Sequence, residues 1–382
     1  MKVLVAHNAY LVRGGEDAVA EAEVALLRAN GHEVVEYFRN NDDVVTMSRV
    51  RLAADTLWSR RTHAEVSALL ARVTPDVVHV HNTLPLISPS LYWAAAGVGV
   101  PVVQTLHNFR LMCPQAMLLR EGKVCESCLG RTPWPAVQHA CYRSSSVQTA
   151  VLGGMLVLHR ALGTYANKVS RYIALTEFCR AKFVQGGLPA DKVVVKPNFV
   201  GDPGPATGSR QGLLFVGRLS PEKGVAALAE AARSLPASSL RVAGSGPAED
   251  TLRGVAGITV LGGLPAAEVA GEMSRAISLV LPSICYENFP RTLVEAFAAG
   301  LPVVASRIGA LAELVEDGVT GLLANPGDAA DLAAKMHWAL AHPVAMAKMG
   351  CAARRVFEAK YTPQENHAQL VAIYQQAIAG AG

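Results

Sequence analysis

The sequence has few charged and few aromatic side chains, and this scarcity excludes some classes of protein. Of its 382 residues, 17% are charged and 6% are aromatic, and the formal net charge is only +4. That excess of positive charge is too small to indicate a nucleic-acid-binding protein. It allows a mildly basic face that could contact phosphate groups or an anionic membrane surface. We therefore expect no nucleic-acid partner.

Long apolar runs are also absent. The first ten residues, MKVLVAHNAY, hold one lysine and an apolar run shorter than the core of a signal peptide. No uncharged apolar run reaches the roughly 18 residues that a transmembrane helix needs. The nearest, residues 149–158, is followed by His159 and Arg160. We expect a cytoplasmic protein, with peripheral contact at the inner face of a membrane left open.

The dinucleotide-binding pattern Gly-x-Gly-x-x-Gly is missing after the first predicted strand, which argues against a dehydrogenase. Gly14 and Gly15 stand there instead, just before a predicted helix. Two glycines in this position let backbone N–H groups approach an anion, and the helix dipole adds to the attraction. A simple turn before a helix explains them equally well.

Hydrophobic residues make up 51% of the chain, enough for two packed cores. Short Val-rich runs alternate with longer helical patterns, which is typical of parallel sheets covered by helices on both faces. Predicted strands of the first half are residues 3–6, 33–37, 77–80, 100–105, 172–175 and 192–195. Those of the second half are residues 213–216, 240–243, 259–261, 277–281 and 303–305.

Residues 198–212, which are rich in Gly, Pro and Ser, form the predicted linker between two domains. We expect an α/β protein with an N-terminal Rossmann-like domain over 1–198 and a second over 199–362. A final helix within 363–382 would pack back on the first domain. Ligands of such sheets bind beyond the carboxyl ends of the strands. The two domains are therefore expected to face each other across an active-site cleft.

Several informative residues follow predicted strands. Arg218 and Lys223 lie in "FVGRLSPEKG", directly after the strand 213–216, although a solvated loop is the ordinary explanation for such a pair. Gly244 and Gly246 follow the next strand, and His107 follows the strand 100–105. All of them are predicted to lie at the ligand-binding edges of the sheets.

Two carboxylates occur in "YENFPRTLVEAFAAGLPVVAS", residues 286–306. Glu287 is predicted in a loop after a strand, and Glu295 one turn into a helix that starts near Pro290. An ionised carboxylate only accepts hydrogen bonds, so each could hold a pair of sugar hydroxyls. The N–H groups of Arg291 and Thr292 open that helix and could hold a diphosphate. Proline is suited to a helix start, because the N–H group that Pro290 lacks would have no partner inside the helix there.

These motifs resemble those of the family-four retaining glycosyltransferases, the glycosyl transferases group 1, which have the GT-B architecture of two facing Rossmann-like domains. The resemblance is very specific over residues 213–323, through "VGRLSPEKG", "GSGP", the two glutamates and "GLPVVASRIGALAELVEDGVTGLL". It is looser in the first half, where it rests on Gly14 and Gly15, "DVVHVHN", "TLHNFRLMCP" and "GLPADKVVVKPN".

The resemblance implies a role for each motif. Arg218 and Lys223 would grip the donor diphosphate, Glu287 would contact the donor sugar and Glu295 the ribose hydroxyls. His107 would lie near the reacting sugar. The other implied donor-binding residues are Gly15, Gly244, Gly246, Asn288, Phe289, Pro290, Arg291 and Thr292, and the acceptor-side residues are Gly14, His81 and Asn82. Pro290 departs from the family's usual glycine, so one backbone N–H is lost there.

The implied reaction transfers a sugar, with retention at the anomeric carbon, from a UDP- or GDP-linked donor to a glycan, lipid-linked or small-molecule acceptor. The resemblance implies that no metal cofactor is required, because Arg218 and Lys223 offset the negative charge of the leaving diphosphate. Two alternatives remain: a nucleotide-sugar epimerase of the same architecture, and a non-catalytic nucleotide-sugar-binding protein. Release of nucleoside diphosphate only when acceptor is present would separate transfer from both.

Four of the seven cysteines, Cys113, Cys125, Cys128 and Cys141, lie in a predicted insert over about residues 112–143. The central C-x-x-C is a good half-site for tetrahedral Zn²⁺, which Cys113 and Cys141 could complete, with His139 as a spare ligand. A polar insert of this length needs a staple to stay ordered. Structural zinc is our prediction, and an iron–sulfur cluster or thiols and disulfides remain alternatives.

Overall fold

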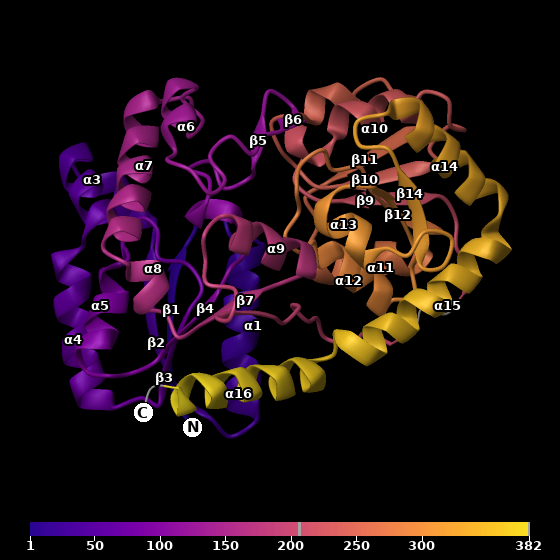
Figure 1. Ribbon diagram of the computed structural model, residues 1–382. Coiled ribbons are helices and arrows are strands. Elements are labelled where there is room, and N and C mark those ends of the chain that lie inside the picture. The colour runs from indigo at the N-terminus through magenta and orange to yellow at the C-terminus, as the bar shows by residue number, and fades with distance from the viewer. Residues whose placement is uncertain (205–207, 381–382) are drawn as a thin grey trace. The chain divides into compact units, whose positions relative to one another are not determined.

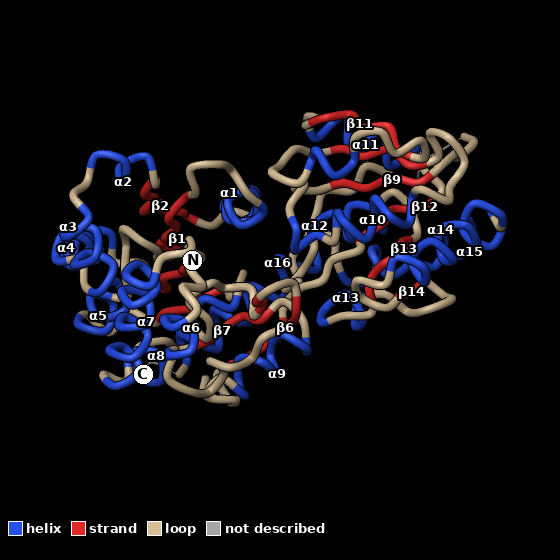
Figure 2. The backbone as a smooth tube through the Cα atoms, turned by 90° about the horizontal axis from the view of Figure 1, so that it is seen from above, coloured by secondary structure: helices blue, strands red, loops and turns tan. Residues whose placement is uncertain are grey.

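The structure is a computed structural model that describes residues 1–204 and 208–380 (Figures 1 and 2). Its contacts divide the chain into two units. The first comprises Met1–Leu118, Glu126–Pro197 and the chain from Asn366 on, and the second comprises Leu119–Cys125 and Asn198–Glu365. Residues 205–207 of the predicted linker and residues 381 and 382 of the predicted terminal segment lie outside the described residues.

The first unit is built on six parallel strands in the order β2-β1-β3-β4-β7-β8. The central strands are buried along most or all of their length, which explains their near-continuous apolar sequences. The strands are β1 (Lys2–Ala9), β2 (Glu33–Asn40), β3 (Val77–Val80), β4 (Val102–Thr105), β7 (Arg171–Ala174) and β8 (Val193–Val195). The helices are α1 (Gly15–Ala29), α2 (Asp42–Thr46), α3 (Arg49–Leu57), α4 (Arg60–Val73), α5 (Ser90–Gly97), α7 (Ser146–Ala161), α8 (Thr164–Asn167) and α9 (Glu177–Gln185).

The second unit also has six parallel strands, in the order β11-β10-β9-β12-β13-β14. Counted within this unit, the order is 3-2-1-4-5-6, that of the doubly wound nucleotide-binding fold. The strands are β9 (Leu213–Val216), β10 (Leu240–Ala243), β11 (Ile258–Gly262), β12 (Ser278–Leu281), β13 (Val303–Ser306) and β14 (Gly321–Ala324). The helices are α10 (Val225–Ala232), α11 (Ala266–Arg275), α12 (Arg291–Ala298), α13 (Gly309–Leu314), α14 (Ala329–Ala341) and α15 (Pro343–Lys360), seen beside the red strands in Figure 2.

The α/β class with two parallel-sheet domains is therefore confirmed, with local corrections. The predicted strand 100–105 begins only at Val102, after Pro101, whose carbonyl accepts from Val78 N. β14, Gly321–Ala324, was not predicted. Its sequence GLLA lacks the β-branched and aromatic residues by which strands are recognised, although all four residues are buried.

The last helix, α16 (Pro363–Ala379), packs on the sheet of the first unit (Figure 1). Leu370, Ile373 and Tyr374 lie in one buried apolar cluster with Val3 and Val103. This cluster holds the end of the chain against β1 and β4.

The predicted insert forms short elements rather than a long loop. They are the hairpin of β5 (Leu119–Arg120) and β6 (Lys123–Val124), and α6 (Trp134–Gln138). The 3-10 turn η1 (Phe109–Leu111) comes just before the insert. Glu121 and Gly122 connect the hairpin with φ angles of 52° and 73°. Two successive positive φ angles are what a two-residue hairpin loop demands. Among the described residues, no helix is both long enough and apolar enough to cross a membrane.

Candidate active site

The strand order of the second unit places two predicted motifs side by side. β10 and β11 lie on one side of β9, and β12, β13 and β14 lie on the other, so the strand order reverses between β9 and β12. Ligands of doubly wound folds bind at this switch point. Arg218 follows the end of β9, and Glu287 follows the end of β12. The two motifs, 69 residues apart by numbering, thus share one edge of the sheet.

Lys223 and Glu287 form a direct ion pair at this edge. Lys223 Nζ lies 2.6 Å from Glu287 Oε1, and Ser283 Oγ donates to the same oxygen at 2.7 Å. Burial opposes the charged forms, but the pair overcomes it: the Lys223 ammonium lowers the pKa of Glu287, and the Glu287 carboxylate raises the pKa of Lys223. Both groups are therefore charged at neutral pH.

Arg218 is held by a second carboxylate. Its Nη2 lies 2.5 Å from Glu222 Oε1, which also accepts from Ser220 Oγ at 2.7 Å. The Arg218 side chain is nevertheless 65% exposed, so its remaining donors can reach an anion. Glu222, Ser220 and Ser283 were not among the predicted site residues, although the first two stand inside the "RLSPEK" motif.

Gly244 and Gly246 are required by close packing of two backbones. Their φ angles are 149° and 156°, and a Cβ on Gly244 would lie 1.9 Å from Gly217 O. On Gly246 it would lie 2.3 Å from Leu219 O. The loop after β10 therefore presses against the loop that carries Arg218, and no larger residue fits.

The helix predicted near Pro290 is α12, and Pro290 is its N-cap with a φ of −71°. Arg291 and Thr292 occupy its first turn, so their N–H groups have no partner inside the helix. Glu295 lies one turn further, 3.0 Å from Arg291 Nε. Before α12, Asn288 and Phe289 are buried, and the Phe289 ring packs on Tyr361.

In the first unit, the two glycines after β1 differ in their surroundings. Gly14 N donates to Asp17 Oδ2 at 2.7 Å, and Asp17 Oδ1 accepts from His7 Nε2 at 2.8 Å. The Gly14 N–H is therefore already used within the unit. A Cβ on Gly15 would meet no atom within 4 Å, so open space adjoins the start of α1 at this residue.

His81 and Asn82 follow β3, and His107 follows β4. The first two have partners within the first unit, and their predicted contact with an acceptor stays a prediction. His81 is buried, and its Nδ1 lies 2.9 Å from Nε2 of the half-buried His107. Asn82 donates to Asn8 O at 2.8 Å and accepts from Leu84 N at 3.1 Å. Asn82 thus shapes its own loop, and His81 contacts His107.

The four cysteines of the insert lie at turns and element ends. Cys113 and Cys128 are buried, and Cys125 and Cys141 are half-buried. Cys125 directly follows β6, and Cys141 N donates to Ala136 O at the end of α6. Zinc binding by these residues stays a prediction.

Comparisons with known proteins agree with this architecture. Residues 9–198 match the family described as "Glycosyl transferase 4-like domain", and residues 210–342 match "Glycosyl transferases group 1". The 2-deoxystreptamine glucosyltransferase of Streptomyces kanamyceticus is 30% identical over 303 residues, which cover 72% of this chain and 71% of that protein. The chain belongs to the group 1 glycosyltransferases.

Other relatives of this glycosyltransferase match over a shorter range. The glycogen synthase of Mycobacterium tuberculosis is 37% identical over 187 residues, 46% of this chain and 45% of that protein. The match thus spans less than half of the mycobacterial enzyme. The solved structure of Anabaena HepE in complex with UDP superposes with a TM-score of 0.71 at 18% identity, covering 97% of this chain and 99% of that one. This likeness shows that the glycosyltransferase shares the fold of HepE.

Proposed function

We propose that this glycosyltransferase moves a sugar from a nucleoside-diphosphate sugar to a hydroxyl acceptor with retention at the anomeric carbon, in the synthesis of a surface polysaccharide, glycolipid or related glycan. The observation that carries the proposal is the gathering of Arg218, Lys223 and Glu287 at the switch point between β9 and β12. There, two cations and one carboxylate stand where this fold binds nucleotides.

The residues suit departure of a nucleoside diphosphate. Arg218 and Lys223 would offset the charge that builds on the leaving diphosphate, and Glu222 and Glu287 hold these two side chains in place beforehand. Glu287 would also accept hydrogen bonds from the donor sugar. The leaving phosphate oxygen would take the proton of the acceptor hydroxyl on the same face, and His107 would contact the reacting sugar. The transfer requires no metal ion in this scheme.

Donor binding is tested by thermal shift with UDP and GDP, because a ligand that binds the folded state raises its melting temperature. HepE was solved with UDP, which makes UDP the first choice and GDP the second. Acceptor-dependent release of the nucleoside diphosphate then tests transfer. Diphosphate release without any dependence on acceptor, or binding without turnover on every acceptor, would contradict the proposed function.

Glu295→Gln is expected to weaken donor binding by about 10–100-fold, the cost of about 1.5–3 kcal/mol for a hydrogen bond to a charged group. Turnover should change much less, because a ribose contact is equally present in the ground and transition states. Donor titration and steady-state kinetics measure the two effects. The matched control is Glu268→Gln, an exposed glutamate on α11. A turnover defect with unchanged donor affinity would show that Glu295 contacts the reacting sugar instead.

We also propose that Cys113, Cys125, Cys128 and Cys141 hold a structural Zn²⁺. Purified protein should then carry about one zinc per chain by elemental analysis. Cys125→Ser should release it and lower the melting temperature, because such sites contribute folding free energy directly. Nucleotide binding by the second unit should persist. Cys351→Ser, an exposed cysteine on α15, is the control. Metal-free protein of unchanged stability would overturn the zinc site.

A further inference from the structure

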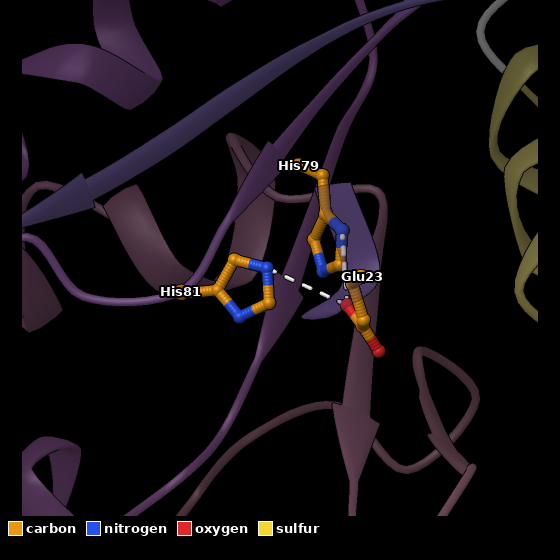
Figure 3. Close-up of side chains that lie close together, drawn as sticks. All are labelled: Glu23, His79 and His81. Atoms are coloured by element: carbon orange, nitrogen blue, oxygen red, sulfur yellow. Dashed lines mark ion pairs between the residues drawn. The ribbon is translucent and has the colours of Figure 1, made fainter. Parts of the chain in front are cut away.

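A cluster of buried ionisable residues lies inside the first unit, among α1, β3 and the chain after β8. Glu23, His79 and His81 approach one another there (Figure 3), and Lys196 joins them. None of the four is more than 4% exposed. Because burying charged and polar groups is costly unless they are paired, each contact in this cluster needs an explanation.

The contacts leave one pair of atoms unexplained. Lys196 Nζ lies 2.7 Å from Glu23 Oε1 and 3.2 Å from Asn366 Oδ1. Among the described residues, Glu23 Oε2 and His81 Nε2 are buried without a hydrogen-bond partner, and they face each other at 3.5 Å, as the dashed line to His81 in Figure 3 shows. The other ring nitrogen of His81, Nδ1, contacts His107 Nε2 at 2.9 Å.

Glu23, His79 and His81 are residue types that bind metal ions, but the surroundings favour hydrogen bonding. Both ring nitrogens of His79 are already occupied, by Thr105 Oγ1 at 2.8 Å and by the Tyr374 hydroxyl at 2.7 Å. Lys196 supplies a positive charge that offsets the Glu23 carboxylate. A divalent cation would leave this buried site with an excess of positive charge.

The three histidines are neutral. Burial lowers the pKa of His81 well below its usual value, lowers that of His79 to about 4, and lowers that of His107. Burial disfavours the Glu23 carboxylate, but the charge and hydrogen bond of Lys196, together with the neighbouring imidazoles, lower the pKa of Glu23. The cluster therefore consists of one carboxylate, one ammonium group and neutral imidazoles.

A neutral imidazole has one N–H donor and one lone pair, so each histidine can exist in two tautomers. If His81 carried its proton on Nδ1, its Nε2 lone pair would face the Glu23 carboxylate, and two acceptors would repel each other in a buried site. With the proton on Nε2, His81 donates to Glu23 Oε2, and its Nδ1 accepts from His107. His107 must then carry its proton on Nε2.

We propose that Glu23, acting through His81, holds His107 in the tautomer that is protonated on Nε2, so that His107 Nδ1 is a hydrogen-bond acceptor. This inference rests on the proposed function: in that tautomer, His107 accepts a hydrogen bond from a hydroxyl of the bound sugar rather than donating one. Glu23 and His81 are positioning residues, because they reach the substrate only through His107. At metal sites, a carboxylate that accepts from the second ring nitrogen of a metal-bound histidine fixes its tautomer in the same way.

Nuclear magnetic resonance of the full chain labelled with ¹⁵N-histidine tests the proposal directly. Two-bond nitrogen–proton correlations at neutral pH distinguish the tautomers, and His107→Gln and His81→Gln assign the signals. We expect both His81 and His107 to be protonated on Nε2. A proton on His107 Nδ1 overturns the proposal. So does a His81 signal that shifts on removal of metal with EDTA, which would show a metal site instead.

A double variant, Glu23→Gln with Lys196→Met, removes the carboxylate without leaving a buried lysine unpaired. We expect His107 to become a mixture of tautomers and turnover to fall by about 10–100-fold, with KM changing less. His79→Gln removes a ring whose Nδ1 lies 3.7 Å from the same Glu23 oxygen, but it leaves the contacts from Glu23 through His81 to His107 in place. It should therefore lower stability but keep the tautomer. A folded double variant with the original tautomer and rate contradicts the proposal.

The wild-type spectrum shows which nitrogen of His107 carries the proton, even if the double variant does not fold. This measurement does not depend on turnover. A wild-type chain that transfers no sugar would therefore reject the proposed function and leave the tautomer as it was measured.

Discussion

Lys223→Ala and Arg218→Ala are each expected to lower turnover by roughly 10²–10³-fold, the scale for losing one preorganised donor that stabilises developing negative charge. Lys223 is already fixed by Glu287 and Arg218 by Glu222, so neither cation has to be reorganised during the reaction. The measurement is acceptor-dependent release of nucleoside diphosphate at saturating donor.

The matched control is Arg253→Ala, which removes an arginine of the same unit that pairs with Asp250 on an exposed surface. Exposed pairs of this kind contribute little, and the rate should stay close to that of the wild type. Near wild-type turnover in both Lys223→Ala and Arg218→Ala would show that these two cations do not stabilise the leaving diphosphate.

Glu287→Gln is expected to lower turnover by roughly 10²-fold while donor affinity changes less. The substitution removes the charge that holds Lys223 Nζ at 2.6 Å and replaces the proposed acceptor for the sugar hydroxyls. Steady-state kinetics and donor titration separate the two effects. If donor affinity collapsed and turnover persisted, the roles assigned to Glu287 and Glu295 would have to be exchanged.

The ion pair also predicts a pH range. The pKa of Glu287 is lowered in the folded state, so its stabilisation is present above the unfolded value of 4.5 and is lost as the pH falls through the lowered pKa. The pKa of Lys223 is raised, so its stabilisation is present below 10.5 and is lost as the pH rises through the raised pKa. Between these values, neither group should produce a step in stability or turnover.

The sheets and their binding edges could be predicted from the sequence because their signals are local. Leu213–Val216 is apolar on both faces, and Val77–Val80 is apolar apart from His79; the structure has the same bounds for both. Residues that follow such runs lie at the carboxyl edge in any parallel sheet, which predicted the placement of Arg218 and Glu287. β14 escaped prediction because Gly321–Ala324 is short and lacks β-branched residues.

The surroundings of the predicted residues could not be predicted, because they depend on contacts that are distant in the sequence. Glu23 pairs with Lys196, 173 positions away, and a glutamate on an amphipathic helix would ordinarily be read as exposed. His81 alternates with His79 on the end of β3, and nothing in the sequence shows that its ring meets His107. The same limit applies to Asn82, whose hydrogen bonds to Asn8 and Leu84 could not be predicted from the sequence.

The most direct test of the central claim is the anomeric configuration of the product. The wild-type chain is incubated with an α-linked nucleoside-diphosphate sugar that raises its melting temperature and with an acceptor that promotes diphosphate release. The proton coupling constant at the new linkage is then read by nuclear magnetic resonance. The account predicts an α-linked product, formed in equal amount to the nucleoside diphosphate. A β-linked product, or an epimerised sugar released without any new linkage, would contradict it.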